Sequence, residues 1–202
     1  MHGFVAYKLG DPTAKSRGRL SLNPLKHLDP FGTVILPLLL MVMGGPVFGY
    51  AKPVPYNPAY FKDPRKGDVL VGLAGPFANL VLACLGALVA WALWPLAQTM
   101  VPNDVFFTYF YGLFLPLFTL INLYFMFFNL LPIPPLDGSS IFAIIIPRKY
   151  LPYYYKIQRY ALPILLVVIF IVPYLFNVNI LGIYLDATAG NLANLLFPYA
   201  IS

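Results

Sequence analysis

The chain has 202 residues, of which 60% are hydrophobic and 10% charged, and its mean hydropathy is +0.76. This composition excludes an ordinary soluble domain and is typical of a multi-pass protein of the cell membrane. The net charge of +6 does not indicate a nucleic-acid or nucleotide partner, because the basic residues flank apolar stretches and so mark the sides of a membrane.

Three further features of the composition limit the chemistry. The N-terminus lacks a secretory signal pattern, so we expect the internal apolar segments to direct membrane insertion. The single cysteine, Cys84, excludes an intrachain disulfide and a cysteine-rich metal site, and we interpret it as a packing residue. All seven acidic residues are aspartates, so these residues include no glutamate.

Four apolar stretches follow one another along the chain. The first, residues 33–50, contains Pro37 and is interrupted by Gly44-Gly45-Pro46, which disfavours a continuous helix. Crossing the hydrocarbon core takes roughly 20 apolar helical residues. Residues 69–97 and 105–129 are therefore long enough, and residues 161–176 are long enough if the helix extends slightly further.

The basic residues predict the topology. All thirteen lie in three segments, residues 8–26, 52–66 and 148–159. By the positive-inside rule these segments are cytoplasmic, which requires residues 33–50 to enter and leave the membrane on one side as a re-entrant hairpin. We therefore predict an all-α polytopic transmembrane helix bundle with a re-entrant hairpin on the cytoplasmic side. The placement of residues 177–202 stays open.

His2 and Asp137 are the candidate metal ligands. Asp137 ends an apolar run in which an uncompensated charge would be costly, so it needs a partner. A helix rise of 1.5 Å per residue places His2 about 12 Å from Gly10 and Asp137 about 16 Å from Arg148, which are comparable depths below the cytoplasmic surface. Imidazole and carboxylate are both common zinc ligands, so we predict that the two residues share one Zn²⁺.

Two protein ligands are one fewer than a catalytic zinc site normally has, so we expect the missing ligand upstream of Met1. The nine residues from His2 to Gly10 are too few to span a bilayer as a helix. The chain is therefore expected to begin partway along a transmembrane helix, and residues 1–202 are expected to form a single membrane-embedded core without that first part.

Several motifs occur in the order of one known family. They are the run from His2 to Gly10-Asp11, the element Gly75-Pro76 with Asn79, and the run Asn129, Pro132, Pro134, Leu136, Asp137 and Gly138. Together they resemble the site-2 protease family of intramembrane zinc metallopeptidases, and residues 23–30 and 51–55 resemble its compact bacterial and archaeal members. The resemblance covers most of residues 2–147.

The resemblance implies a helix with the motif His-Glu-x-x-His, in which His2 is the second histidine and the glutamate is the general base. Asp137 would be the third zinc ligand. The first histidine and the glutamate are absent here, so we expect the chain as written to bind zinc poorly and to be inactive. Either the start lies further upstream or the sequence is a fragment, or the protein is a noncatalytic relative.

Each candidate residue also has a simpler interpretation. Asp137 could cap the helix that begins at Gly138. Asn79 is a candidate contact for the substrate backbone or a developing oxyanion, but it could also only join neighbouring helices. Asn129 is a weaker substrate-binding candidate, and His27 is interpreted as a structural or surface residue. The aromatic cluster Tyr153-Tyr154-Tyr155 is interpreted as part of an interfacial belt.

The hairpin at residues 33–50, with Gly44 and Gly45, is a candidate substrate-binding segment, because an extended edge could pair with an unwound substrate helix. We therefore predict a zinc metalloendopeptidase that hydrolyses transmembrane segments of other membrane proteins near the cytoplasmic face. The alternative is a noncatalytic relative that binds such proteins. A transporter is disfavoured because no internal repeat is visible.

Overall fold

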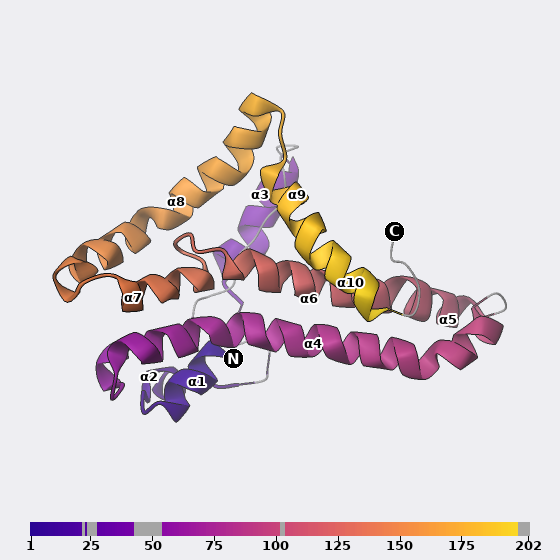
Figure 1. Ribbon diagram of the computed structural model, residues 1–202, viewed down its shortest axis with the longest axis horizontal. Helices are drawn as coiled ribbons and strands as arrows, with labels where there is room; N and C mark the ends of the chain where they lie inside the picture. Colours follow the sequence, from indigo (N-terminus) through magenta and orange to yellow (C-terminus); the bar gives the residue numbers. More distant parts are fainter. Residues whose placement is uncertain (22, 24–27, 43–53, 102–103, 198–202) are drawn as a thin grey trace. The chain divides into compact units, whose positions relative to one another are not determined.

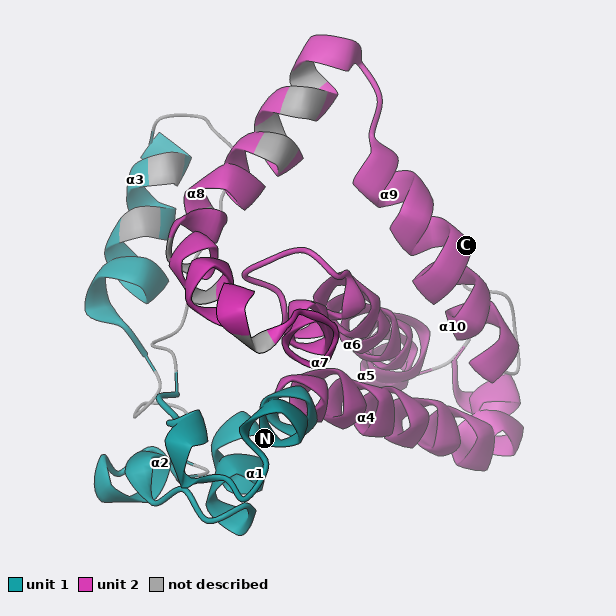
Figure 2. Cartoon of the chain, turned by 60° about the vertical axis from the view of Figure 1, so that its left-hand side comes forward, with its two compact units in different colours: residues 1–71 teal, residues 72–202 magenta. Residues whose placement is uncertain are grey.

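The computed structural model describes residues 1–21, 23, 28–42, 54–101 and 104–197. Every regular element in these ranges is a helix, which confirms the all-α class. The chain divides into two compact units, residues 1–71 and residues 72–202 (Figure 2), and each is described separately below.

The first unit contains short helices around a small apolar core. Its elements are α1 (His2–Lys8), α2 (Thr13–Ser16), a π-helical segment (Pro30–Ile35), α3 (Leu36–Val42), a 3-10 turn (Pro58–Tyr60) and the first residues of α4 (Pro64–Met100). Ala6, Phe61 and Val71 form the buried core, against which Val5 and Leu9 pack. The core therefore fixes α1 against the start of α4.

The predicted hairpin is described only in part. Residues 33–42 are helical, and the helix includes Pro37 near the start of α3. Gly44 and Gly45 lie outside the described residues, as does the rest of the stretch to residue 50, so the re-entrant turn stays a prediction.

Helix α4 is longer than the apolar pattern predicted. It begins at Pro64 rather than at residue 69, because the Asp63 side chain accepts hydrogen bonds from the backbone amides of Arg65 and Lys66 and so satisfies free donors at the helix start. With 37 residues it is about 55 Å long. The helix continues through Pro76 and Pro95.

In the second unit, α4 lies beside a helix formed by α5 (Val105–Tyr109), a π-helical segment (Phe110–Phe114) and α6 (Leu115–Leu130), as Figure 1 shows. Asp104 caps this helix through the Phe107 amide. Small residues of α4 allow the close approach, since Ala83, Ala87 and Ala90 are buried. The Tyr111 hydroxyl donates to the Ala90 carbonyl at 3.0 Å.

The remaining elements follow the Asp137 motif. They are a 3-10 helix (Asp137–Ile141), α7 (Phe142–Ile145), a 3-10 turn (Arg148–Tyr150), α8 (Leu151–Phe176), α9 (Ile180–Leu185), a π-helical segment (Asp186–Gly190) and α10 (Asn191–Leu196). The depth estimate for Asp137 assumed a helix as far as Arg148, whereas the helix ends at Ile145, so the assumed rise does not hold for the last residues and the depth itself stays a prediction. Pro147 disfavours helical backbone in the residue before it.

Two helices of the described chain are long and apolar enough to cross a membrane, Pro64–Met100 and Val105–Leu130. They contain the two stretches that the sequence predicted most strongly, residues 69–97 and 105–129. Helix α8 contains the fourth stretch, residues 161–176, within 26 helical residues.

Candidate functional site

Asp137 lies at the first position of a short 3-10 helix that is held tightly on two sides. A Cβ atom on Gly138 would lie 2.3 Å from the Leu130 carbonyl oxygen at the end of α6. A Cβ atom on Gly72 of α4 would lie 2.4 Å from Ser140 Oγ and 2.9 Å from the Asp137 carbonyl oxygen. Only glycine fits at both positions, because real Cβ contacts are longer than this. The backbone that carries Asp137 is therefore fixed by α4 and α6.

Helix α8 holds the same short helix from a third direction. The hydroxyl of Tyr154, which is 6% exposed, donates a hydrogen bond of 2.7 Å to the Ser139 carbonyl oxygen. The Gln158 side-chain amide in turn donates to the Tyr154 hydroxyl at 2.7 Å. Sequence reasoning missed this pair and assigned Tyr154 to an interfacial belt. The available signal was a glutamine four residues after a tyrosine in an apolar helix, a spacing that places both on one face.

The N-cap position of the Asp137 helix is occupied by Leu136. Asp137 therefore follows the cap position, which does not fit the simpler interpretation of the residue as the N-cap. Its side chain is partly buried. Three residues later, the Ser140 hydroxyl is buried and has no hydrogen-bond partner within the described chain, which leaves an unsatisfied polar group close to Asp137 in the sequence.

His2 is the first residue of α1 and is partly buried in the first unit. Its Nδ1 atom lies 2.7 Å from the backbone carbonyl oxygen of Val71. If Nδ1 carries the proton, this hydrogen bond fixes the orientation of the ring. Metal-binding histidines commonly use their second nitrogen in this way.

The Gly-Asp pair that closes the first motif has a structural role in the first unit. Gly10 has a positive φ of 104°, a conformation that favours glycine. The turn places the Asp11 carboxylate in a fully buried position. There it accepts hydrogen bonds from the amide of Thr13 at 2.9 Å, from the Thr13 hydroxyl and from the amide of Asn57 at 2.6 Å. Asp11 thus joins the end of α1 to the segment around Asn57.

These hydrogen bonds determine the pKa of Asp11. Burial by itself raises the pKa of the carboxyl, but the donors on Thr13 and Asn57 stabilise the charged form more strongly. The pKa of Asp11 therefore lies below its ordinary value.

The other predicted site residues are less fully defined. Asn79 of α4 and Asn129 of α6 are both partly buried, and neither side chain has a hydrogen-bond partner in the described part of the chain. Both amides are therefore available to a ligand. Gly44, Gly45 and His27 lie outside the described residues.

The chemistry of the two metal candidates fits zinc. His2 offers a nitrogen on an oriented ring, and Asp137 offers a carboxylate on a backbone fixed by two glycines. His2 belongs to the first unit and Asp137 to the second. The described residues contain no cluster of three histidine, cysteine, aspartate or glutamate side chains, and thus no complete catalytic ligand set.

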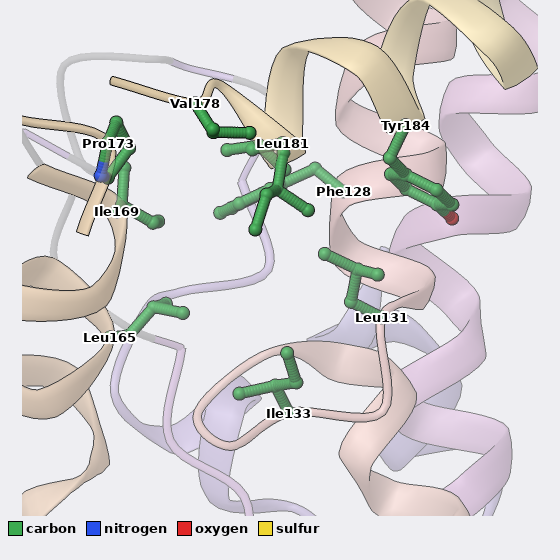
Figure 3. A pocket seen from close by; sticks show the side chains of 10 residues that line it. Phe128, Leu131, Ile133, Leu165, Ile169, Pro173, Val178, Leu181 and Tyr184 are labelled. Carbon is green, nitrogen blue, oxygen red and sulfur yellow. The ribbon is translucent and has the colours of Figure 1, made fainter. Parts of the chain in front are cut away.

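An apolar cavity of about 310 Å³ follows the end of α6 in the second unit. Side chains from α6 and the segment after it, from α8 and from α9 face the cavity (Figure 3). They include Leu131 and Ile133, which precede Asp137 in the same motif. Among the described residues of the lining, Tyr184 alone has a polar side chain, and its hydroxyl donates to the Phe127 carbonyl.

Comparison with known proteins gives consistent results. A family model described as Peptidase family M50 matches residues 107–172. YwhC of Bacillus subtilis is 41% identical over 177 residues, which cover 85% of this chain and 74% of YwhC. Rip2 of Mycolicibacterium smegmatis is 37% identical over 137 residues, which cover 68% of this chain and 48% of that protein.

Rip2 of Mycobacterium tuberculosis is 33% identical over 139 residues, which cover 69% of this chain and 49% of that protein. All three relatives carry the name "Putative zinc metalloprotease". The chain spans about half the length of the two Rip2 proteins. No solved structure matches the chain.

The similarity to YwhC extends over most of both proteins. The chain therefore belongs to peptidase family M50, the site-2 protease family of zinc metalloproteases.

Proposed function

We propose that this protein is the core of an intramembrane zinc metalloendopeptidase that hydrolyses peptide bonds in transmembrane segments of other membrane proteins. Family membership supports the reaction class. The observation in this chain that supports the proposal is the 2.7 Å contact between His2 Nδ1 and the Val71 carbonyl oxygen, because metal-binding histidines commonly hold their rings through such a contact of the other nitrogen.

In this proposal His2 and Asp137 are two of the protein ligands of Zn²⁺. Bound zinc supplies the Lewis acidity that peptide hydrolysis needs. Asn79 and Asn129 bind the substrate, because their amides are partly buried in the proposed membrane-spanning helices and have no hydrogen-bond partner among the described residues. The Asn79 amide donates a hydrogen bond to the substrate backbone, or to the carbonyl oxygen of the substrate that becomes negatively charged during hydrolysis. Gly44 and Gly45 belong to a segment that pairs with the unwound substrate.

The proposed topology places the chemistry in the cell membrane near the cytoplasmic side. Helix α4 runs outward, residues 105–130 return inward and α8 runs outward again as a third span, while residues 33–50 form a re-entrant hairpin. The distribution of the thirteen basic residues supports this arrangement. Residues 1–202 would then act as a single membrane-embedded core.

These 202 residues contain no glutamate and therefore no general base of the His-Glu-x-x-His type. We accordingly expect the chain by itself to bind zinc weakly and to cleave nothing. A variant extended before Met1 by an apolar helix that ends in His-Glu-Ala would complete the motif with His2 as its second histidine.

The test compares the chain and the extended variant in liposomes that contain a panel of single-pass transmembrane peptides. We expect about one zinc per protein and peptide cleavage for the extended variant alone. Its substitutions His2→Ala and Asp137→Asn should each remove most of the zinc, whereas Asp63→Asn, an exposed aspartate at the start of α4, should retain it.

Full zinc retention in the Asp137→Asn variant would remove Asp137 from the site. Peptide binding without any cleavage by the zinc-loaded extended variant would overturn the protease proposal and indicate a binding protein.

A further inference from the structure

We propose that Tyr154 and Gln158 of α8 are positioning residues that hold the Asp137 carboxylate in place for metal binding. This inference rests on the proposed role of Asp137 as a zinc ligand. It adds two residues of α8 to the proposed metal site.

The Asp137 helix needs external support. Its five residues and the four of α7 that follow directly make a helical segment of nine residues, and so short a segment has little stability of its own. The contacts of Gly72 and Gly138 are steric, so they limit how the helix can approach α4 and α6 but supply no hydrogen bond. A directional contact is required to fix the rotation of the helix about its axis, and this rotation determines where the Asp137 carboxylate points.

Tyr154 supplies this directional contact. Its hydroxyl donates to the carbonyl oxygen of Ser139, two residues after Asp137, and lies 3.4 Å from the Ser139 hydroxyl. Both residues are buried, with exposed fractions of 6% for Tyr154 and 2% for Ser139. A hydrogen bond excluded from water in this way is costly to break, because the buried carbonyl would lose its partner.

Gln158 orients the tyrosine hydroxyl. A tyrosine hydroxyl has one hydrogen to donate, and it can accept through its oxygen. Because the Gln158 amide donates to that oxygen at 2.7 Å, the hydroxyl hydrogen is directed to Ser139. The chain from Gln158 through Tyr154 to Ser139 therefore has one consistent direction, and it connects α8 to the backbone that carries Asp137.

The matched control is the neighbouring tyrosine. Tyr153 is 67% exposed and lies on the same turn of α8. The substitution Tyr153→Phe removes a hydroxyl from the same helix and changes the composition identically, whereas Tyr154→Phe also removes the bond to Ser139.

The experiment is a double-mutant cycle on the 202-residue chain in detergent, with Zn²⁺ alone as the probe. Its dissociation constant is measured by equilibrium dialysis, which suits the weak binding expected of this chain. We expect Tyr154→Phe to raise the dissociation constant about tenfold, the lower end of the range for groups that orient metal ligands. Tyr153→Phe should leave it unchanged. In the Asp137→Asn background, Tyr154→Phe should have no further effect, because the ligand that it positions is absent.

The outcomes separate the two proposals. If Asp137→Asn leaves zinc binding unchanged, the proposed role of Asp137 fails. If Asp137→Asn weakens zinc binding but Tyr154→Phe does not, the positioning role of Tyr154 is overturned. The same conclusion follows if Tyr154→Phe weakens zinc binding equally in the natural and the Asp137→Asn backgrounds. Should Tyr154→Phe fail to fold, Gln158→Leu keeps the tyrosine and tests the same chain. It should weaken zinc binding only when Asp137 is present, and an equal effect in both backgrounds would overturn the inference.

Discussion

Asp11 is a fully buried carboxylate in the first unit, and hydrogen bonds from backbone and side chain stabilise its charge. Hydrogen bonds to a charged group contribute more than those to a neutral one. Because three donors from Thr13 and Asn57 converge on it, Asp11 stabilises the turn after α1 and thereby the position of His2 on that helix.

We expect Asp11→Asn to lower the free energy of unfolding by about 1 to 3 kcal/mol, because an amide replaces a charged acceptor and turns one of the two acceptor oxygens into a donor. The thermal midpoint of the detergent-solubilised protein measures the change. Asp63→Asn is the matched control, because the Asp63 side chain is 49% exposed and asparagine is an equally good cap. An unchanged midpoint for Asp11→Asn would contradict the stabilising role of this carboxylate.

The same residue predicts a pH dependence. The pKa of Asp11 is lower in the folded protein than in the unfolded chain, where it is about 3.9. Its contribution to stability is therefore present above the unfolded value and is lost as the pH falls through the folded value. Thermal midpoints measured from neutral pH downward should fall more steeply for the natural sequence than for Asp11→Asn. Parallel curves would show that another group is responsible.

At the scale of the elements, the Asp137 helix depends on close backbone contacts with its neighbours. Gly72 and Gly138 allow α4 and the end of α6 to approach it more closely than any Cβ atom would permit. These contacts allow the segment that follows α6 to pack closely against α4.

We expect Gly138→Ala to lower stability by about 1 to 3 kcal/mol, because the new methyl group would meet the Leu130 carbonyl at 2.3 Å. It should also lower zinc retention by displacing Asp137. Gly112→Ala is the control, because a Cβ there would meet nothing within 4 Å and alanine favours the helix. Thermal midpoints and metal content of the two variants test the contrast. Equal effects of the two substitutions would show that close packing at Gly138 is not required.

At the scale of the whole molecule, the apolar lengths and the basic segments together define a topology. Helix α4 and residues 105–130 carry many exposed apolar side chains, among them Phe77, Leu88, Phe106 and Phe125. Such a surface is suited to contact with lipid, and we expect these helices and α8 to cross the bilayer.

Cysteine labelling tests this topology in a Cys84→Ser background, since the natural cysteine is exposed. With a membrane-impermeant thiol reagent, we expect Lys66→Cys and Lys149→Cys to react only from the cytoplasmic side. Gln98→Cys and Asn177→Cys should react only from the opposite side. Labelling of positions 66 and 98 from the same side would exclude α4 as a transmembrane helix, and labelling of positions 149 and 177 from the same side would exclude α8.

The sequence by itself determined the helical class, the two strongest apolar helices and the family, because apolar length, charge placement and motif order are local properties of the chain. It also singled out His2 and Asp137, since a carboxylate in an apolar run and a histidine before a Gly-Asp pair are visible in the residue order. The roles of both residues in zinc binding stay predictions.

Only the tertiary structure decided what holds these residues. The bond from His2 to Val71 joins residues 69 positions apart, and the contact of Gly72 with Ser140 and the bond from Tyr154 to Ser139 each join different elements. Helix length was also misjudged after Asp137, where Pro147 ends the helix early. Such features depend on which elements pack together, and periodicity along the chain does not encode the partner of a buried carbonyl or the space available to a Cβ atom.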